Sequence, residues 1–127
     1  MMKGGIRIRG DKIDLVFEGN PPPGEEGDCF IDVEGRYIAP GFIDIHSHGG
    51  GGHDFMDGSV EAILEGSRAH MVHGTTSILP TTVASKREVI YELLRNYEEA
   101  QKQLGEGPEL LGIHLEGPYF SIEQRGA

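Results

Sequence analysis

The chain has 127 residues, 21 of them acidic and 11 basic, so its net charge is −10, and its hydrophobic content is 37%. This charge balance argues against a nucleic-acid partner, because phosphate binding requires a basic patch, and no run of about 18 apolar residues is present to span a membrane. The single cysteine, Cys29, allows no internal disulfide and fits a reducing compartment, so we expect a cytoplasmic protein in which Cys29 packs as a small apolar residue.

The first forty residues are predicted to form a small antiparallel β domain. Apolar and polar residues alternate over 6–17 around Gly10-Asp11, a pattern typical of a hairpin. Residues 21–27 contain three prolines and form a loop, because proline does not fit inside a sheet. Beyond this loop a second hairpin is expected, with strands over 29–33 and 36–39.

From Gly41 onward the pattern alternates between strands and helices. The expected strands cover 42–48, 75–79 and 110–115. The first helix follows Ser59, a plausible N-cap, and ends near Gly74. The second follows a capping box at 85–88 and ends at Gly105. This β-α-β-α-β order predicts a parallel sheet with right-handed crossovers, in which chemistry gathers at the carboxyl ends of the strands.

The most informative pair of residues is His46 and His48, which end the first of these strands. Alternate residues of a strand share a face, so the two imidazoles point the same way with Cα atoms about 6.6 Å apart, at roughly 3.3 Å per residue. They can converge on one metal ion. Ile43 and Ile45 face the other way, which suits a strand covered by a helix, and Gly49–Gly52 is expected to be a flexible loop. The competing interpretation is a pair of solvent-facing histidines.

Glu116 stands at the end of the third strand and is the next candidate ligand. Its carboxylate would lie at the same rim as the two histidines, although an exposed strand-end glutamate is an equally good interpretation from the residues alone. His114 lies one step deeper and is expected to form hydrogen bonds near the site.

Other polar residues are expected to have structural roles. His53 and Asp54 follow the glycine run and either line the mouth of a pocket or are exposed. His70 and His73 belong to the first helix. The threonine pairs 75–76 and 81–82 either donate hydrogen bonds near the site or merely suit strands and turns. Ser47 has no evident base partner, so nucleophilic catalysis is a poor hypothesis.

Four segments together resemble the N-acetylglucosamine-6-phosphate deacetylases of the amidohydrolase superfamily. They are P-G-F-I-D-I-H-S-H-G at 40–49, G-G-G-G-H-D-F-M-D at 49–57, H-G-T-T-S-I-L-P-T at 73–81 and G-I-H-L-E-G-P-Y-F-S at 112–121. The resemblance runs from about Val33 to Ala127. It implies that residues 41–127 are the first part of a (β/α)8 barrel, and that residues 1–40 are part of a small β-sandwich domain.

The same resemblance implies an enzyme that uses one or two divalent metal ions. Zinc is the expected metal, and iron or another divalent metal is the alternative. The enzyme would remove acetate from N-acetylglucosamine 6-phosphate and give glucosamine 6-phosphate. Glu116 falls on the metal-binding glutamate of the family, and His46 and His48 fall on a pair that some members replace. Ala127 falls in a segment that contacts the sugar. The family also implies a homo-oligomer, a dimer.

The remaining metal histidines and the catalytic aspartate of the family belong to later barrel strands, and a full barrel takes about 250 residues. We therefore expect an N-terminal piece whose parent is the deacetylase, while this chain alone is inactive. The alternatives are an oligomerising, non-catalytic barrel fragment that binds metal weakly, or another member of the superfamily, against which H-L-E-G-P at 114–118 argues.

Overall fold

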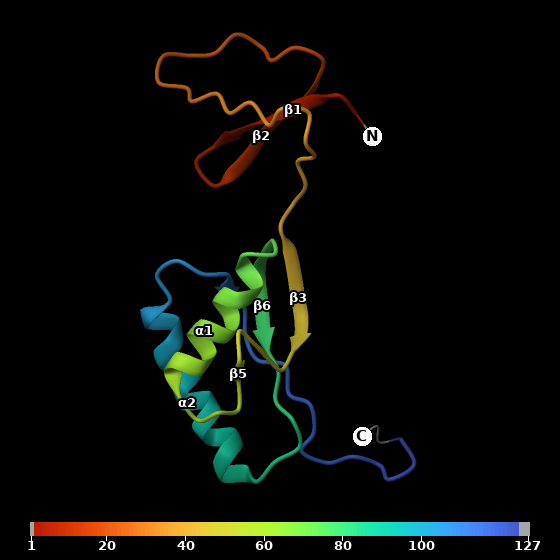
Figure 1. Cartoon of the computed structure of the whole chain (residues 1–127), viewed down its shortest axis with the longest axis vertical. Coiled ribbons are helices and arrows are strands. Elements are labelled where there is room, and N and C mark those ends of the chain that lie inside the picture. The colour runs from red at the N-terminus through yellow and green to blue at the C-terminus, as the bar shows by residue number, and fades with distance from the viewer. Residues whose placement is uncertain (1, 125–127) are drawn as a thin grey trace. The chain divides into compact units, whose positions relative to one another are not determined.

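The computed structural model describes residues 2–124, and the chain divides into two compact units, residues 1–40 and 41–127 (Figure 1). Ala127, the residue expected to contact a sugar, lies outside the described residues. Neither helix found in residues 2–124 has the length and apolar content that a membrane crossing would need.

The first unit contains one antiparallel hairpin, as its alternating pattern predicts. Strand β1 (Gly4–Arg9) pairs with β2 (Lys12–Glu18), and the turn uses Gly10 at φ 61°. The guanidinium of Arg7 bonds the carboxylate of Asp14 across the pair at 2.6 Å. Local pairing and a two-residue turn are sufficient to define this hairpin.

The second hairpin of this unit was predicted wrongly. Its turn is present, with Glu34 at φ 53° and a bond from the Arg36 amide to the Val33 carbonyl at 2.9 Å. No strand flanks this turn within residues 29–39, and Ile31 and Tyr37 are 78% and 80% exposed. A two-stranded ribbon without an apolar surface beneath it is only marginally stable. Cys29 lies in the same irregular segment and is exposed rather than packed.

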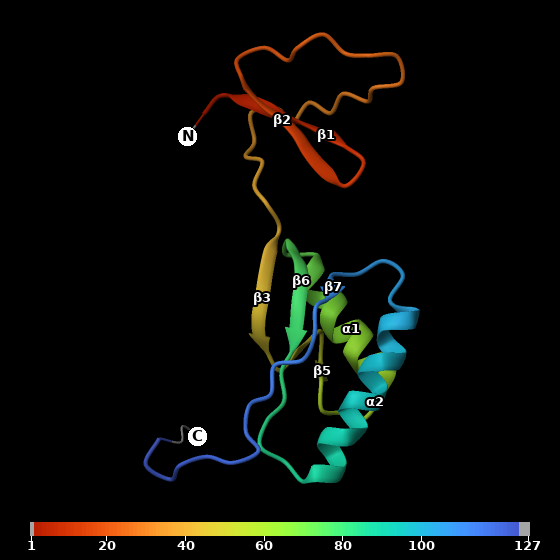
Figure 2. The same cartoon turned by 180° about the vertical axis from the view of Figure 1, so that it is seen from behind.

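The second unit is built on a three-stranded parallel sheet in the order β3-β6-β7, as expected. The strands are β3 (Phe42–Ser47), β6 (Thr75–Pro80) and β7 (Glu109–Leu110). Helices α1 (Val60–Met71) and α2 (Arg87–Gln103) pack against one another, and α1 also packs on β6 (Figures 1 and 2). The buried apolar core comes from both helices, β6, β7 and the turn before α1: Phe55, Ile63, Leu64, Ile78, Leu93, Tyr97, Ala100 and Leu110.

The glycine run after β3 forms a tight hairpin instead of the expected flexible loop. Residues Gly49–Gly50 (β4) pair antiparallel with His53–Asp54 (β5). Gly50 packs so closely on α1 that a Cβ there would lie 2.9 Å from the Gly66 carbonyl oxygen and 3.0 Å from His70 Nε2. Absence of a side chain at Gly50 therefore lets this hairpin lie against the helix.

One helix start was predicted correctly and the other was not. The Ser59 hydroxyl caps α1 by accepting a bond from the Ala62 amide at 3.1 Å. The capping box at 85–88 does not form, because α2 begins at Arg87 with Lys86 as its N-cap and has no side-chain cap bond. For Ser85 to serve as the N-cap of a capping box, the helix would have to begin one residue earlier, at Lys86.

The third strand is shorter than the predicted 110–115. Beyond Leu110 the chain still follows β6, through bonds from the Leu111 amide to the Ile78 carbonyl at 3.1 Å and from the His114 amide to the Pro80 carbonyl at 3.0 Å. The ladder between these two bonds is broken where Gly112 adopts φ 156°. Glu116, which was predicted at the end of the third strand, instead lies beyond β7, and its amide bonds the Thr82 hydroxyl just after β6 at 2.9 Å.

The prediction that a helix covers Ile43 and Ile45 was wrong for the described residues. These side chains are 63% and 61% exposed. The reason is topological: β3 is an edge strand, and α1 packs on β4, β5, β6 and α2.

Candidate metal centre

The structure brings His46, His48 and Glu116 together. The Nε2 atoms of His46 and His48 lie 2.9 and 3.4 Å from Glu116 Oε2, and they lie 3.2 Å from each other. One donor atom from each residue falls within 4.8 Å of the other two, which is a spacing that can hold a metal ion. The end of β3 and the chain that follows β7 thus place their donor atoms close together.

The separations fit a single zinc ion. Nitrogen ligands at about 2.0–2.1 Å from a tetrahedral zinc lie about 3.3 Å apart, close to the 3.2 Å between the two imidazole nitrogens. Two imidazoles and one carboxylate also form a common donor set for zinc. His48 Nδ1 is buried and has no hydrogen-bond partner in the described structure. The polar contacts of that ring are therefore made through Nε2, the atom that faces Glu116.

His114 supports the site without joining the three donors. Its Nδ1–H donates to the Ile45 carbonyl at 2.7 Å, which links the segment after β7 to β3. Its ring also lies 4.5 Å from the His46 ring, measured between centroids. The predicted hydrogen-bonding role near the site is confirmed.

His70 fixes the chain that follows His48. Its Nε2 lies 2.9 Å from the Gly49 carbonyl oxygen and 3.1 Å from the Ser47 hydroxyl. A carbonyl only accepts, so Nε2 carries the proton and cannot act as a base toward Ser47. Nδ1 lies 3.9 Å from a carboxylate oxygen of Asp44. The structural role expected for His70 is confirmed, and the arrangement again argues against a serine nucleophile.

The remaining candidates lie outside this group of three donors. Asp54 accepts a bond from the Met56 amide at 2.8 Å and so shapes the turn before α1. His53 belongs to β5, and His73 follows the end of α1.

For the threonine pair 81–82, the structure supports the first of the two interpretations left open by the sequence, hydrogen bonds near the site. Thr81 and Thr82 are 0% and 1% exposed, and their hydroxyls bond the backbone of Ser47 and Glu116 respectively. The sequence offered only one signal for them, a pair of polar β-branched residues directly after the central strand.

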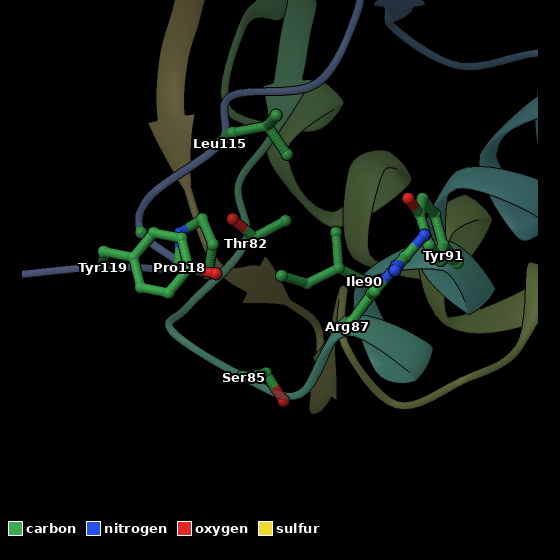
Figure 3. A pocket seen from close by; sticks show the side chains of 9 residues that line it. Thr82, Ser85, Arg87, Ile90, Tyr91, Leu115, Pro118 and Tyr119 are labelled. Carbon is green, nitrogen blue, oxygen red and sulfur yellow. The ribbon is translucent and has the colours of Figure 1, made fainter.

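A cavity of about 280 Å³ adjoins the centre (Figure 3). Leu115 and Gly117, the chain neighbours of Glu116, line it together with Thr82 and residues from the start of α2. Its arginine, Arg87, lies over the Tyr91 ring at 5.0 Å from the centroid. The space beside Glu116 is therefore bounded by both apolar and polar side chains.

A parallel α/β sheet with two imidazoles and a carboxylate close together beyond its strands, in a group that could hold a metal ion, is typical of metal-dependent α/β proteins. The model of the amidohydrolase family matches residues 37–126, and the chain belongs to this family.

Within this family, the chain is similar to enzymes that share one name. The chain is 37% identical to the N-acetylglucosamine-6-phosphate deacetylase of Mus musculus over 136 residues, which cover 100% of this chain and 32% of the relative. It is 43% identical to the Bacillus subtilis enzyme of the same name over 93 residues, which cover 71% of this chain and 24% of the relative.

A crystal structure of the Pasteurella multocida N-acetylglucosamine-6-phosphate deacetylase matches with a TM-score of 0.80 and 32% identity, covering 97% of this chain and 32% of that one. The predicted fold, the N-terminal part of an amidohydrolase barrel, is confirmed. The chain spans about a third of the length of the Mus musculus and Pasteurella multocida relatives, which align with 100% and 97% of it.

Proposed function

We propose that this chain supplies part of the metal site of an N-acetylglucosamine-6-phosphate deacetylase, with His46, His48 and Glu116 as ligands. The observation that carries the proposal is the convergence of these three donors within 4.8 Å of one another. The deacetylase names of relatives that align with the whole chain support the substrate, an N-acetylated amino-sugar phosphate. The reaction would release acetate and leave glucosamine 6-phosphate.

A divalent ion at this position would activate water and polarise the amide carbonyl. Residues of the chain supply the donor atoms at this position and hold them in place. Glu116 supplies a negative charge that favours a cation, and the two imidazoles supply neutral nitrogen donors. His114 and His70 hold the strand end that carries the imidazoles. We propose zinc as the ion, because the distance between two nitrogen ligands of a tetrahedral zinc is close to the 3.2 Å between His46 Nε2 and His48 Nε2.

Zinc affinity of the chain tests the ligand assignment. Alanine at His46, His48 or Glu116 should weaken zinc binding by more than the roughly 10–100-fold that loss of an outer partner costs. Isothermal titration calorimetry measures this affinity, and His73→Ala is the matched control, because His73 lies outside the group. Unchanged zinc affinity in the His46 and His48 variants would show that the assignment is wrong.

A chimera tests the reaction. This chain replaces the corresponding segment of the Bacillus subtilis deacetylase, and acetate release from N-acetylglucosamine 6-phosphate is measured with added zinc. We expect turnover that Glu116→Gln abolishes, because glutamine keeps the shape but removes the negative charge. A chimera that folds and binds zinc but releases no acetate would contradict the proposed reaction.

For the chain by itself we propose metal binding without turnover. The described residues offer three donors to one ion and no further carboxylate or histidine within that group. Glu116-dependent acetate release by the isolated chain would overturn this part of the proposal. A cytoplasmic location and a homo-oligomer, which we also propose, follow from the sequence and the family resemblance alone.

A further inference from the structure

Two adjacent threonines occupy the space between the ligand-bearing segments. Thr81 and Thr82 directly follow the central strand β6, with the β3 end on one side and the chain after β7 on the other. Both side chains are buried, at 0% and 1% exposure. A buried hydroxyl costs free energy unless it is hydrogen-bonded, so the partners of these two hydroxyls show what they stabilise.

The Thr81 hydroxyl is inserted into the ladder between β3 and β6. It accepts from the Ser47 amide at 3.0 Å and donates to the Leu79 carbonyl at 3.1 Å. The Thr81 amide in turn donates to the Ser47 carbonyl at 2.9 Å. The register between β3 and β6 shifts in this stretch, between Asp44 and Ser47. The hydroxyl thus bridges a gap in the ladder at the residue that separates His46 from His48.

The Thr82 hydroxyl makes the corresponding contact on the other side. It accepts from the Glu116 amide at 2.9 Å and donates to the Glu116 carbonyl at 3.0 Å. The Thr82 amide donates to the His114 carbonyl at 3.0 Å. Glu116 lies beyond the end of β7, where no regular ladder holds the backbone. Both peptide groups of Glu116 are therefore fixed by one side chain of the central segment.

We propose that Thr81 and Thr82 are positioning residues that set the separation between the histidine pair and Glu116, and so the affinity of the centre for zinc. The inference rests on the proposed metal site. Valine would satisfy strand propensity and volume equally well at both positions, but it would leave the amides of Ser47 and Glu116 without their acceptor. The hydroxyl is therefore the group that the geometry requires.

Zinc titration of three variants of the chain tests the proposal. Thr82→Val should weaken zinc binding about tenfold, at the lower end of the range for outer partners of a metal site. Thr82→Ser keeps the hydroxyl and should restore most of the affinity. Thr76→Val is the matched control, since the Thr76 hydroxyl meets the Phe42 carbonyl at 3.5 Å near the other end of the same strands.

A double-mutant cycle separates positioning from general loss of stability. Thr82→Val should add nothing to the zinc affinity lost by Glu116→Ala, because no carboxylate remains to be positioned. Full additivity in this cycle, or equal losses from valine and serine at Thr82, would overturn the proposal.

Amide hydrogen exchange provides a readout that needs no metal. Thr82→Val should speed exchange at the Glu116 amide and leave Ser47 protected, while Thr81→Val should do the reverse. If the unsubstituted chain binds no zinc but the two variants show this exchange pattern, the proposed metal site is refuted and the backbone contacts are supported. If the chain binds zinc but both variants change exchange equally at the Ser47 and Glu116 amides, the positioning roles of the two threonines are refuted and the metal site is not.

Discussion

Single residues decide how closely the β4–β5 hairpin and helix α1 approach. His70 donates to the Gly49 carbonyl at 2.9 Å, and the backbone of Gly50 passes against the Gly66 carbonyl. The position of His48, one residue before this hairpin, depends on the same contact. A side chain added at Gly50 would therefore disturb the strand end that carries the histidines.

Gly50→Ala should lower the free energy of unfolding by about 1–3 kcal/mol, the usual cost of overpacking. The new methyl group would lie 2.9 Å from a backbone oxygen, which cannot turn away as a flexible side chain could. Urea denaturation measures the change. Gly24→Ala is the control, because the nearest atom to its added methyl would be 3.5 Å away. Equal effects of the two substitutions would contradict this account.

The convergence of His46, His48 and Glu116 could be predicted from the sequence, whereas the particular partners of Thr81 and Thr82 could not. His46, His48 and Glu116 each follow an apolar segment, and the carboxyl ends of parallel strands meet at one rim. Thr81 and Thr82 act through the backbone of Ser47 and Glu116, so their roles depend on register between strands. Register across a crossover leaves no local signal in the sequence.

Among the elements, α2 contacts the sheet through a buried tyrosine hydroxyl and a neighbouring glutamine side chain. Tyr97 is 7% exposed and donates to the Leu110 carbonyl of β7 at 2.8 Å. The Gln101 amide donates to both groups at 3.2 Å. Burial raises the pKa of the Tyr97 hydroxyl above 10.0, because the charged phenolate is poorly solvated there.

The raised pKa of Tyr97 makes the free energy of unfolding depend on pH in the alkaline range. The folded chain holds the Tyr97 proton to higher pH than the unfolded chain. The contribution of the neutral Tyr97 hydroxyl to the free energy of unfolding is therefore complete below about pH 10, and it is lost as pH rises through the folded-state pKa. Tyr97→Phe should cost about 1 kcal/mol at pH 8 and should make the decline above pH 10 less steep. Urea denaturation across this range measures both effects.

Tyr91→Phe on the same helix is the control, because Tyr91 is 44% exposed. It should leave both the stability at pH 8 and the alkaline slope nearly unchanged. An alkaline slope that Tyr97→Phe does not alter would contradict the role assigned to this hydroxyl.

Helices were predicted more reliably than short strands. The apolar stripes of α1 and α2 extend over three or more turns, and Ser59 marks one start unambiguously. The segments 29–39 and 110–115 have strand-like composition, but forming a strand depends on a partner. In the second segment the regular ladder ends at Leu110, while the apolar side chains Ile31 and Tyr37 of the first segment remain exposed.

On the scale of the whole molecule, the second unit exposes the outer edge of its sheet. Phe42, Ile43 and Ile45 of β3 are between 61% and 68% exposed, and β3 pairs only with β6 in the described structure. Unpaired apolar edge strands invite pairing with another chain. The chain should therefore self-associate through β3 as its concentration rises.

Ile43→Lys should shift the chain toward monomer, because a charge on an edge strand opposes pairing. Sedimentation equilibrium measures the association. Val72→Lys is the matched control, since Val72 is 74% exposed but lies at the end of α1. Association that both substitutions weaken equally, or that neither weakens, would exclude β3 as the interface.

The placement of the three donors has a thermodynamic consequence. His46 and Glu116 lie on opposite sides of the central strand, and the chain between them includes both helices. An ion held by both would act as a removable cross-link that closes this long loop. At 100 times its dissociation constant, such an ion would stabilise the folded state by about 2.7 kcal/mol. Free zinc concentration would then govern how much of the chain is folded, and a chelator would act as a denaturant.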